Sequence, residues 1–262
     1  MKRDPGHGAG PGTLFLIATP IGNLEDITLR ALRVLQEVDW IAAEDTRRTA
    51  ILLRRHGIDC RLFSHHAHSE HRSAPGLVSR LMAGESGALV TDAGTPAISD
   101  PGFHLARAAR RAGIRVEVIP GPSAILAALL ASGLPADRFA FWGYPPPREG
   151  ARRRFIESAM SQGCTIVVFE APHRVLRCME AIAAIDPERE VAICREMTKK
   201  FEQIDRGAAR DLLERAGRGP QRGEFTLVIA AGRTKGGTTA ADADAGSGGD
   251  AGSSTPDAER RR

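Results

Sequence analysis

The sequence predicts an α/β protein of two domains, and three observations support this fold class. Short apolar runs alternate with stretches of helical periodicity between residues 13 and 119, which is typical of a parallel sheet covered by helices. After Ser123 the order of elements changes, and an exposed antiparallel strand expected at 201–206 indicates a second sheet of mixed direction. From Gly236 onward, Gly, Ala, Ser, Thr and Asp dominate, which is typical of a disordered tail.

The first domain is expected to contain five strands. Its first strand is predicted at residues 13–19, because Leu14 to Ile17 form an unbroken apolar run. Further strands are expected at residues 39–43, 61–64, 88–91 and 115–119. Between these strands, apolar residues recur at helical spacing and predict helices at residues 25–37, 46–55, 73–83 and 103–112.

The second domain is expected to begin with an apolar helix at residues 124–132, which Gly133 and Pro135 end. Strands follow at residues 139–142, 165–169, 191–194, 201–206 and 223–230, and a helix begins near the basic run 152–154. The predicted domains are residues 13–121 and 122–233. Residues 1–12 and 234–262 are predicted to be disordered.

Unusual loops follow four of the predicted strands, at Thr19, Glu44, Asp92 and Pro120. In an open α/β sheet, ligands bind in the crevice beyond the carboxyl ends of the strands. The loop at 92–102 is rich in Asp, Gly and Pro, which favours a small-molecule pocket at this edge. The alternative is a tight turn in which Asp100 caps the following helix, and the loop alone does not decide between them.

The composition is that of an ordinary globular protein, with 42% hydrophobic and 26% charged residues among 262. The net charge of +4 is compatible with a polyanionic partner without requiring one. Four scattered cysteines indicate free thiols in a reducing compartment. No apolar run is long enough to cross a bilayer or to form the core of a signal peptide, so we expect a cytoplasmic protein without membrane contact.

Several common cofactor and metal motifs are missing from the sequence. No Gly-X-Gly-X-X-Gly follows the first strand, and neither a P-loop nor a His-Glu-X-X-His motif occurs. His65, His66, His68 and His71 form a cluster, but no carboxylate or cysteine pattern supports it as a metal site. We therefore expect a polar loop near the pocket and no metal.

Seven loop and strand-end motifs occur together in one known family and in the same order. They are residues 18–28, 43–49, 91–96, 120–124, 170–174, 195–199 and 223–225. Through these motifs the sequence resembles the ribosomal RNA small subunit methyltransferase I family of the tetrapyrrole methylase superfamily, over about residues 13–232. Small departures at Ser69, Tyr144 and Arg222 leave the charge pattern largely unchanged.

The resemblance implies two α/β domains of tetrapyrrole methylase type with S-adenosyl-L-methionine in a cleft between them, usually in a homodimer. The implied reaction is 2'-O-methylation of cytidine-1402 in the 16S rRNA of the bacterial small ribosomal subunit. The residues expected to bind the cofactor are Pro20, Asp92, Ala93, Gly94, Thr95, Ser99, Ser123 and Glu224. For Pro20 and Ser123 the alternative is an ordinary turn or cap role.

A ribose 2'-hydroxyl is a very weak acid, so a base or a cationic neighbour is expected beside it. The candidates each follow a predicted strand and are Glu44, Asp45, His173, Glu196 and Lys199. Ion pairing of Glu44 or Asp45 with Arg47, and of Glu196 with Arg195, is an equally good interpretation. Lys199 would act as a base only with a lowered pKa.

Basic side chains are expected to contact the phosphates of the RNA. The candidates are Arg47, Arg48, Arg148, Arg152, Arg153, Arg154, Arg174 and Lys200, and the alternative is a solvated helix face. Two other functions are compatible with parts of the sequence. A methylase of the same superfamily that acts on a tetrapyrrole is disfavoured, because residues 92–96 replace the Gly-Asp-Pro typical of such enzymes. An inactive RNA-binding protein would bind no cofactor.

Overall fold

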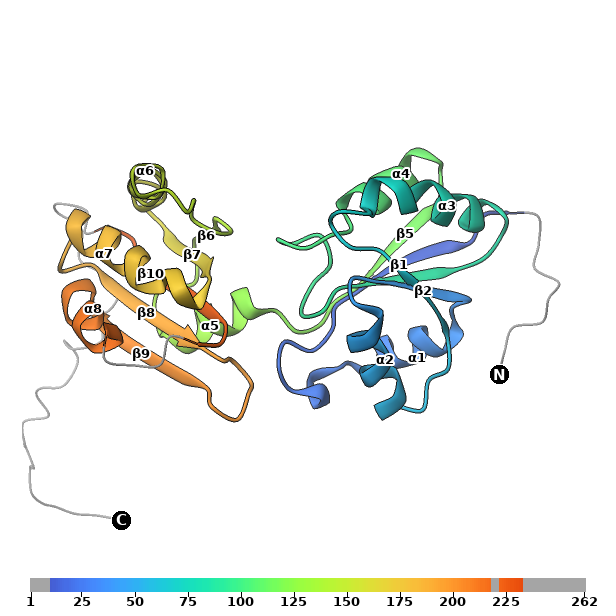
Figure 1. Cartoon of the computed structure of the whole chain (residues 1–262), viewed down its shortest axis with the longest axis horizontal. Coiled ribbons are helices and arrows are strands. Elements are labelled where there is room, and N and C mark those ends of the chain that lie inside the picture. The colour runs from blue at the N-terminus through green and yellow to red at the C-terminus, as the bar shows by residue number, and fades with distance from the viewer. Residues whose placement is uncertain (1–9, 218–221, 233–262) are drawn as a thin grey trace, which may run out of the picture. The chain divides into compact units, whose positions relative to one another are not determined.

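The computed structural model describes residues 10–217 and 222–232, which form two five-stranded sheets with their helices (Figure 1). The predicted disordered ends lie outside these residues, except for 10–12. The division into domains at residues 121 and 122 remains a prediction. Among the described helices, none combines the length and apolarity that a membrane span requires.

The first sheet has the strand order β3-β2-β4-β1-β5, and all its neighbouring strands are parallel. Its strands are β1 (Thr13–Ile17), β2 (Trp40–Ala43), β3 (Arg61–Ser64), β4 (Gly87–Val90) and β5 (Arg115–Ile119). The predicted parallel sheet is therefore confirmed. Because all five strands run the same way, their carboxyl ends lie at one edge of the sheet.

Helices cover both faces of this sheet (Figure 1). They are α1 (Leu29–Glu37), α2 (Thr46–Arg55), α3 (Glu70–Met82) and α4 (Phe103–Arg111). Side chains alternate along each strand, so Ile41 packs with α1 and α2, whereas Trp40 packs with α3 and α4. Burial on both faces explains why these strands read as continuous apolar runs in the sequence.

The second sheet has the order β6-β7-β10-β8-β9 and is mixed, as predicted. Its strands are β6 (Phe139–Phe141), β7 (Thr165–Glu170), β8 (Glu190–Arg195), β9 (Gln203–Ala208) and β10 (Phe225–Ile229). Only β6 and β7 are parallel neighbours, and the other pairs are antiparallel. The exposed strand predicted at 201–206 is β9, which pairs with β8 alone.

Four helices pack on the second sheet, three of them on one face. Met179 and Leu212 belong to the core that α6 (Glu149–Met160), α7 (Val175–Ile185) and α8 (Ala209–Gly217) form with the sheet. The helix α5 (Ala124–Ser132) covers the opposite face through Ala128 and Leu129. Its predicted start is confirmed, because the Ser123 hydroxyl accepts a hydrogen bond from the Leu126 N–H.

Two predicted helices differ from the structure, and one alternative that the sequence left open is not observed. The helix expected at 25–37 is a short 3₁₀ turn (Leu24–Asp26) followed by α1, because Thr28 adopts extended backbone and caps α1 with its side chain. The helix expected from residue 73 begins at Glu70. Asp100 does not cap α4, whose N-cap is Gly102.

Candidate functional site

A cavity of about 670 Å³ lies at the carboxyl edge of the parallel sheet. Loops and helix starts that follow four of its strands line the cavity: Ile21 follows β1, Glu44 and Arg48 follow β2, residues 92–95 and 98–100 follow β4, and 123–126 follow β5. The predicted convergence of these four strand ends is therefore observed. This is the place where open α/β sheets bind small molecules.

Residues of the second sheet and of the loop after β6 line the same cavity with an aromatic wall. Phe139, Phe141, Tyr144 and Phe169 all contribute to it. The Phe169 ring is 4.8 Å from the Phe141 ring and 5.6 Å from the Tyr144 ring, measured between centroids. Such a wall offers flat apolar surfaces to a ring of a ligand.

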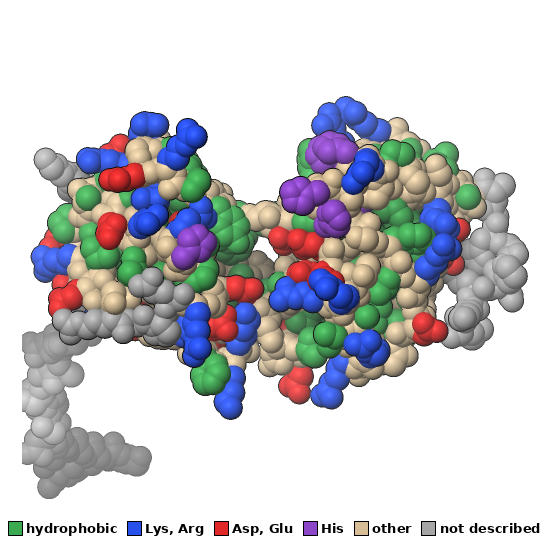
Figure 2. Space-filling model, viewed as in Figure 1, with side chains coloured by type: hydrophobic (Ala, Val, Ile, Leu, Met, Phe, Trp, Pro, Cys, Tyr) green, Lys and Arg blue, Asp and Glu red, His purple; other side chains and the backbone are tan. Residues whose placement is uncertain are grey.

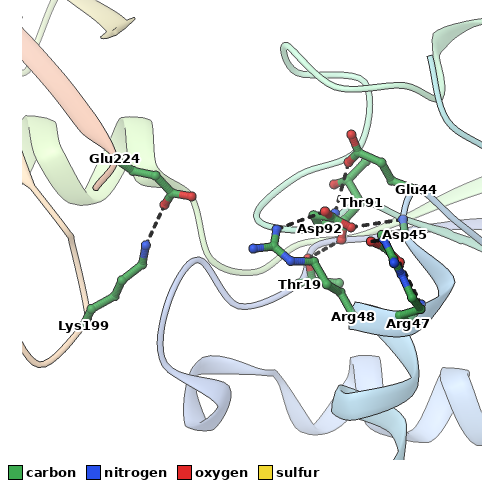
Figure 3. Close-up of polar contacts among 9 residues, drawn as sticks. All are labelled: Thr19, Glu44, Asp45, Arg47, Arg48, Thr91, Asp92, Lys199 and Glu224. Carbon is green, nitrogen blue, oxygen red and sulfur yellow. Dashed lines mark hydrogen bonds and ion pairs between the residues drawn. The ribbon is translucent and has the colours of Figure 1, made fainter. Parts of the chain in front are cut away.

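Hydrogen bonds join the loop after β1 to the loop after β4. Thr19 and Gly94 exchange two backbone hydrogen bonds of 2.9 and 3.0 Å. The Thr19 hydroxyl donates to the Thr91 carbonyl at 3.0 Å (Figure 3). Gly94 has a φ of 78°, a left-handed conformation that favours glycine. The two loops are thus held together where the cavity begins.

Asp92 connects the loops after β2 and β4. One oxygen of its carboxylate accepts the Asp45 backbone N–H at 3.1 Å, and the other accepts the Arg48 guanidinium at 3.0 Å (Figure 3). The Asp92 backbone N–H in turn donates to the Glu44 carboxylate at 3.2 Å. Asp45 caps α2 through its side chain and pairs with Arg47. This network fixes the cavity wall at the ends of two neighbouring strands.

A buried glutamate holds the far end of the loop after β4. One oxygen of the Glu70 carboxylate accepts the backbone N–H groups of Gly102 and His104, each at 2.8 Å. These N–H groups belong to the start of α4, where helix N–H groups lack partners within the helix and favour a negative charge. Glu70 therefore caps the N-terminus of α4, because Gly102 at the N-cap position has no side chain to accept these hydrogen bonds.

We expect Glu70→Ala to lower the free energy of unfolding by about 2–4 kcal/mol, because it leaves two backbone donors without partners in a mostly buried place. Urea denaturation of the wild type and the variant measures this loss. Glu37→Ala is a matched control, since Glu37 forms only an exposed pair with Arg33 within one helix. Equal losses in the two variants would contradict the role assigned to Glu70.

The cavity is acidic, since it is lined by Glu44, Asp92, Asp100 and Glu224. Burial raises the pKa of Glu44 above its ordinary value. Burial, together with the nearby charges of Glu44, Asp92 and Glu224, raises the pKa of Asp100 to about 7. With apolar walls and negative charge, the cavity suits a cationic ligand that carries a ring system.

Lys199 lies beside the cavity in an ion-pair group with two carboxylates. Its ammonium is 2.9 Å from the Glu196 carboxylate. It is 3.0 Å from the Glu224 carboxylate (Figure 3). Burial lowers the pKa of Lys199, but the hydrogen bonds to Glu196 and Glu224 outweigh it and raise that pKa overall. The hydrogen bond from Lys199 in turn lowers the pKa of Glu196. Lys199 is therefore protonated at neutral pH and does not act as a base there.

The structure brings together most residues that the sequence predicted for cofactor binding. Those that line the cavity are Asp92, Ala93, Gly94, Thr95, Ser99, Ser123 and Glu224. Pro20 is buried and does not line it, whereas its neighbour Ile21 does. Of the candidate bases only Glu44 lines the cavity; Asp45, His173, Glu196 and Lys199 do not.

The predicted phosphate contacts differ in how accessible they are. Arg152 is only 4% exposed and donates to the Pro147 carbonyl, so its guanidinium is not available to a phosphate. Arg174 is largely buried and forms a 2.6 Å ion pair with Glu170. The remaining candidates are exposed and are Arg47, Arg48, Arg148, Arg153, Arg154 and Lys200. On the face drawn in Figure 2, basic side chains form separate groups beside acidic ones.

The histidine cluster is partly structural. His65 is fully buried, and its Nδ1 is 2.7 Å from the Ser73 hydroxyl. His71 stacks on His104, with 3.9 Å between ring centroids. Within the described part of the chain, no three His, Cys, Asp or Glu side chains are placed to hold a metal ion.

Sequence reasoning missed the aromatic wall and the place of Asp100 in the cavity. The sequence contained a usable signal, because Phe141 and Phe169 lie at or near the ends of predicted strands, where a ligand is expected. From the sequence, Asp100 is expected only to accept hydrogen bonds or to cap a helix. Its position depends on backbone conformations after Pro96 that residue types alone do not predict.

Comparison with known proteins agrees with this geometry. The sequence pattern of the family described as Tetrapyrrole (Corrin/Porphyrin) Methylases matches residues 13–213. "Ribosomal RNA small subunit methyltransferase I" of Escherichia coli O157:H7 is 44% identical over 232 residues, which cover 87% of this chain and 81% of the relative. The protein of the same name from Xylella fastidiosa is 46% identical over 222 residues, with 84% and 81% covered.

A solved structure shows the same fold. The uroporphyrin-III-C-methyltransferase of Thermus thermophilus superposes with a TM-score of 0.59 at 24% identity and covers 84% of this chain and 94% of its own. The two sheets described above are thus the fold of a methyltransferase class, and the chain belongs to the tetrapyrrole (corrin/porphyrin) methylase family. It is a methyltransferase that uses S-adenosylmethionine.

Proposed function

We propose that the protein transfers a methyl group from S-adenosylmethionine to the 2'-hydroxyl of cytidine-1402 in 16S rRNA. The observation that carries the proposal is the acidic, aromatic-walled cavity at four converging strand ends. The relatives are named as ribosomal RNA small subunit methyltransferases, which supports rRNA of the small subunit as the substrate. The choice of the ribose 2'-hydroxyl and of cytidine-1402 rests on the resemblance of the sequence motifs to that family.

The residues of the cavity fit this donor. S-adenosylmethionine supplies an electrophilic methyl group on a positively charged sulfur. Asp92 and Glu224 place negative charge around a cation, and Gly94 brings backbone close to the ligand. The rings of Phe141 and Phe169 offer a surface to a base. Holding the acceptor oxygen in line with the methyl carbon contributes on the order of 7–11 kcal/mol to such a transfer.

Methyl transfer to defined RNA tests the proposal. Purified protein is incubated with labelled S-adenosylmethionine and, separately, small ribosomal subunits lacking the modification, naked 16S rRNA and a porphyrinogen. We expect label in 16S rRNA, and 2'-O-methylcytidine at position 1402 after nuclease digestion and mass spectrometry. Label in the porphyrinogen alone, or in a base rather than a ribose, would refute the proposed function.

We also propose that exposed arginines bind the RNA backbone, with Arg153 as a representative. Arg153→Gln is expected to reduce the dependence of RNA affinity on salt, by about one unit in the slope of log K against log salt. Arg33→Gln is the matched control, because both arginines pair with a glutamate one helical turn away, Glu157 and Glu37, and have similar exposure, 62% and 60%. Equal slopes for wild type and Arg153→Gln in filter binding would count against this contact.

The homodimer and the cytoplasmic location expected from the sequence also belong to this proposal. Large apolar side chains are exposed at Leu29, Leu130 and Phe201, which is compatible with burial against a second copy. Sedimentation velocity gives the oligomeric state directly. A monomer at micromolar concentration would contradict the homodimer.

A further inference from the structure

Asp100 is an unpartnered carboxylate at the cavity. It lines the cavity and is partly buried, yet among the described residues its carboxylate has no hydrogen-bond or ion-pair partner. The neighbouring Asp92 carboxylate, in contrast, accepts the Asp45 N–H and the Arg48 guanidinium. Placing an ionisable group in partial burial without a partner costs free energy. Such a group is free to act on a ligand.

The backbone around Asp100 adopts an unusual conformation. Ala97 and Ser99 have φ values of 68° and 63°, in the left-handed region that non-glycine residues avoid, and Gly102 follows at 130°. The Ala97 N–H donates to the Pro101 carbonyl at 3.2 Å and closes a small loop that carries Asp100. Glu70 holds the end of this loop at Gly102. Residues held in such conformations cluster at active sites, where the surrounding structure maintains them.

The other acidic and basic candidates are occupied or lie outside the cavity. Asp45 caps α2 and pairs with Arg47, which lowers the Asp45 pKa to about 2. Glu196 accepts the Lys199 ammonium and the Glu224 backbone N–H. Glu44 lines the cavity but accepts the Asp92 backbone N–H. The carboxylates of Asp45, Glu196 and Glu44 therefore already accept hydrogen bonds from protein groups around the cavity.

His173 is exposed and does not line the cavity, and Lys199 is protonated at neutral pH. Asp100 is therefore left as the carboxylate that both faces the cavity and has no partner among the described residues.

We propose that Asp100 is the general base that removes the proton from the ribose 2'-hydroxyl. The assignment rests on the proposed function, since it requires a hydroxyl acceptor. The 2'-oxygen forms a bond to the methyl carbon as the bond from that carbon to sulfur breaks. The sulfur keeps the electron pair and becomes a neutral thioether, and the hydroxyl proton moves to the Asp100 carboxylate. The protonated carboxyl then releases this proton to solvent.

The surroundings of Asp100 prepare it for this step. Burial is the main reason why the Asp100 pKa is raised to about 7. The negative charges of Glu44, Asp92 and Glu224 raise this pKa further. Tyr144 also faces Asp100, and the charge of Asp100 is one of the causes that raise the Tyr144 pKa. The cation Arg48 lies at the same wall and pairs with Asp92. A base with a pKa near the working pH transfers protons most effectively, so the methyl-transfer rate is expected to rise through about pH 7 and then level off.

The test measures single-turnover methyl transfer by Asp100→Asn at saturating S-adenosylmethionine and RNA, between pH 5.5 and 9. Asparagine keeps the shape of the side chain and removes the base. We expect the rate constant to fall by about 10²–10⁴-fold and its rise near pH 7 to disappear. Asp59→Asn is the control, because Asp59 is exposed and lies outside the cavity, and it is expected to keep the wild-type profile.

Two measurements without turnover keep the assignment falsifiable. Calorimetry is expected to give donor dissociation constants for Asp100→Asn within about threefold of wild type. In ¹³C-carboxyl NMR of the ligand-free protein, one resonance titrating near pH 7 is expected to be missing from Asp100→Asn. A wild-type rate constant in the variant would overturn the assignment, as would a loss confined to donor affinity. Failure of the wild type to methylate rRNA would instead refute the proposed function.

Discussion

Asp92→Asn is expected to weaken S-adenosylmethionine binding about 10–150-fold. The Asp92 carboxylate accepts the Asp45 backbone N–H and the Arg48 guanidinium. These bonds hold the wall of the cavity and do not reach the donor, so only the part of their free energy that keeps the wall in its binding shape is lost from affinity. A hydrogen bond to a charged group contributes about 1.5–3 kcal/mol, which sets the size of this range. Losing the charge also leaves Arg48 unpaired at the wall of a cavity proposed to hold a cation. Isothermal titration calorimetry measures the change in dissociation constant.

Asp39→Asn is a matched control for this variant. Asp39 precedes β2 and accepts the Ser86 N–H before β4 at 2.7 Å, so it joins the same two strands at their opposite ends. We expect a similar loss of stability but an unchanged donor affinity. If both variants bind the donor as the wild type does, Asp92 is wrongly placed in the binding site.

Trp40→Ala is expected to cause the largest loss of stability, about 3–5 kcal/mol. Trp40 is 1% exposed in the core between the parallel sheet, α3 and α4. Its ring makes an edge contact with Phe63, with 6.1 Å between centroids. Removing a buried ring leaves a cavity that neighbouring side chains fill only in part. Urea denaturation gives the loss directly.

The absence of a side chain at Gly87 leaves the space that the Trp40 ring occupies in the core. A Cβ atom added at Gly87 would lie 2.3 Å from the Trp40 ring, so Gly87→Ala is expected to cost about 1–3 kcal/mol by overpacking. In the Trp40→Ala background the added methyl group meets empty space, and its cost is expected to disappear. Purely additive losses in this double-mutant cycle would show that the two residues are not coupled.

Much of the fold could be predicted because the strands are buried on both faces. Leu14 to Ile17 and Leu89 to Val90 are apolar without alternation, and parallel strands covered by helices require this. Ser123 is followed by an apolar helix, and its capping role is readable from residue type. The convergence of four loops also followed from topology, because parallel strands end at one edge.

Other features depend on contacts between residues far apart in the chain. Nothing local to Gly102 indicates that Glu70, more than thirty residues earlier, caps α4. Arg152 belongs to a run of three arginines, yet it alone lies on the buried face of α6 and bonds to Pro147. The loop that carries Asp100 has left-handed conformations at Ala97 and Ser99, which those residue types disfavour.

A crystal structure with S-adenosylhomocysteine tests the central claim most directly, because the account requires one donor pocket built by loops from separate strands. The ligand sulfur is expected in the cavity lined by Asp92, Gly94 and Ser123, with the adenine against Phe141 or Phe169. A ligand bound anywhere outside this cavity, with these residues untouched, would contradict the account.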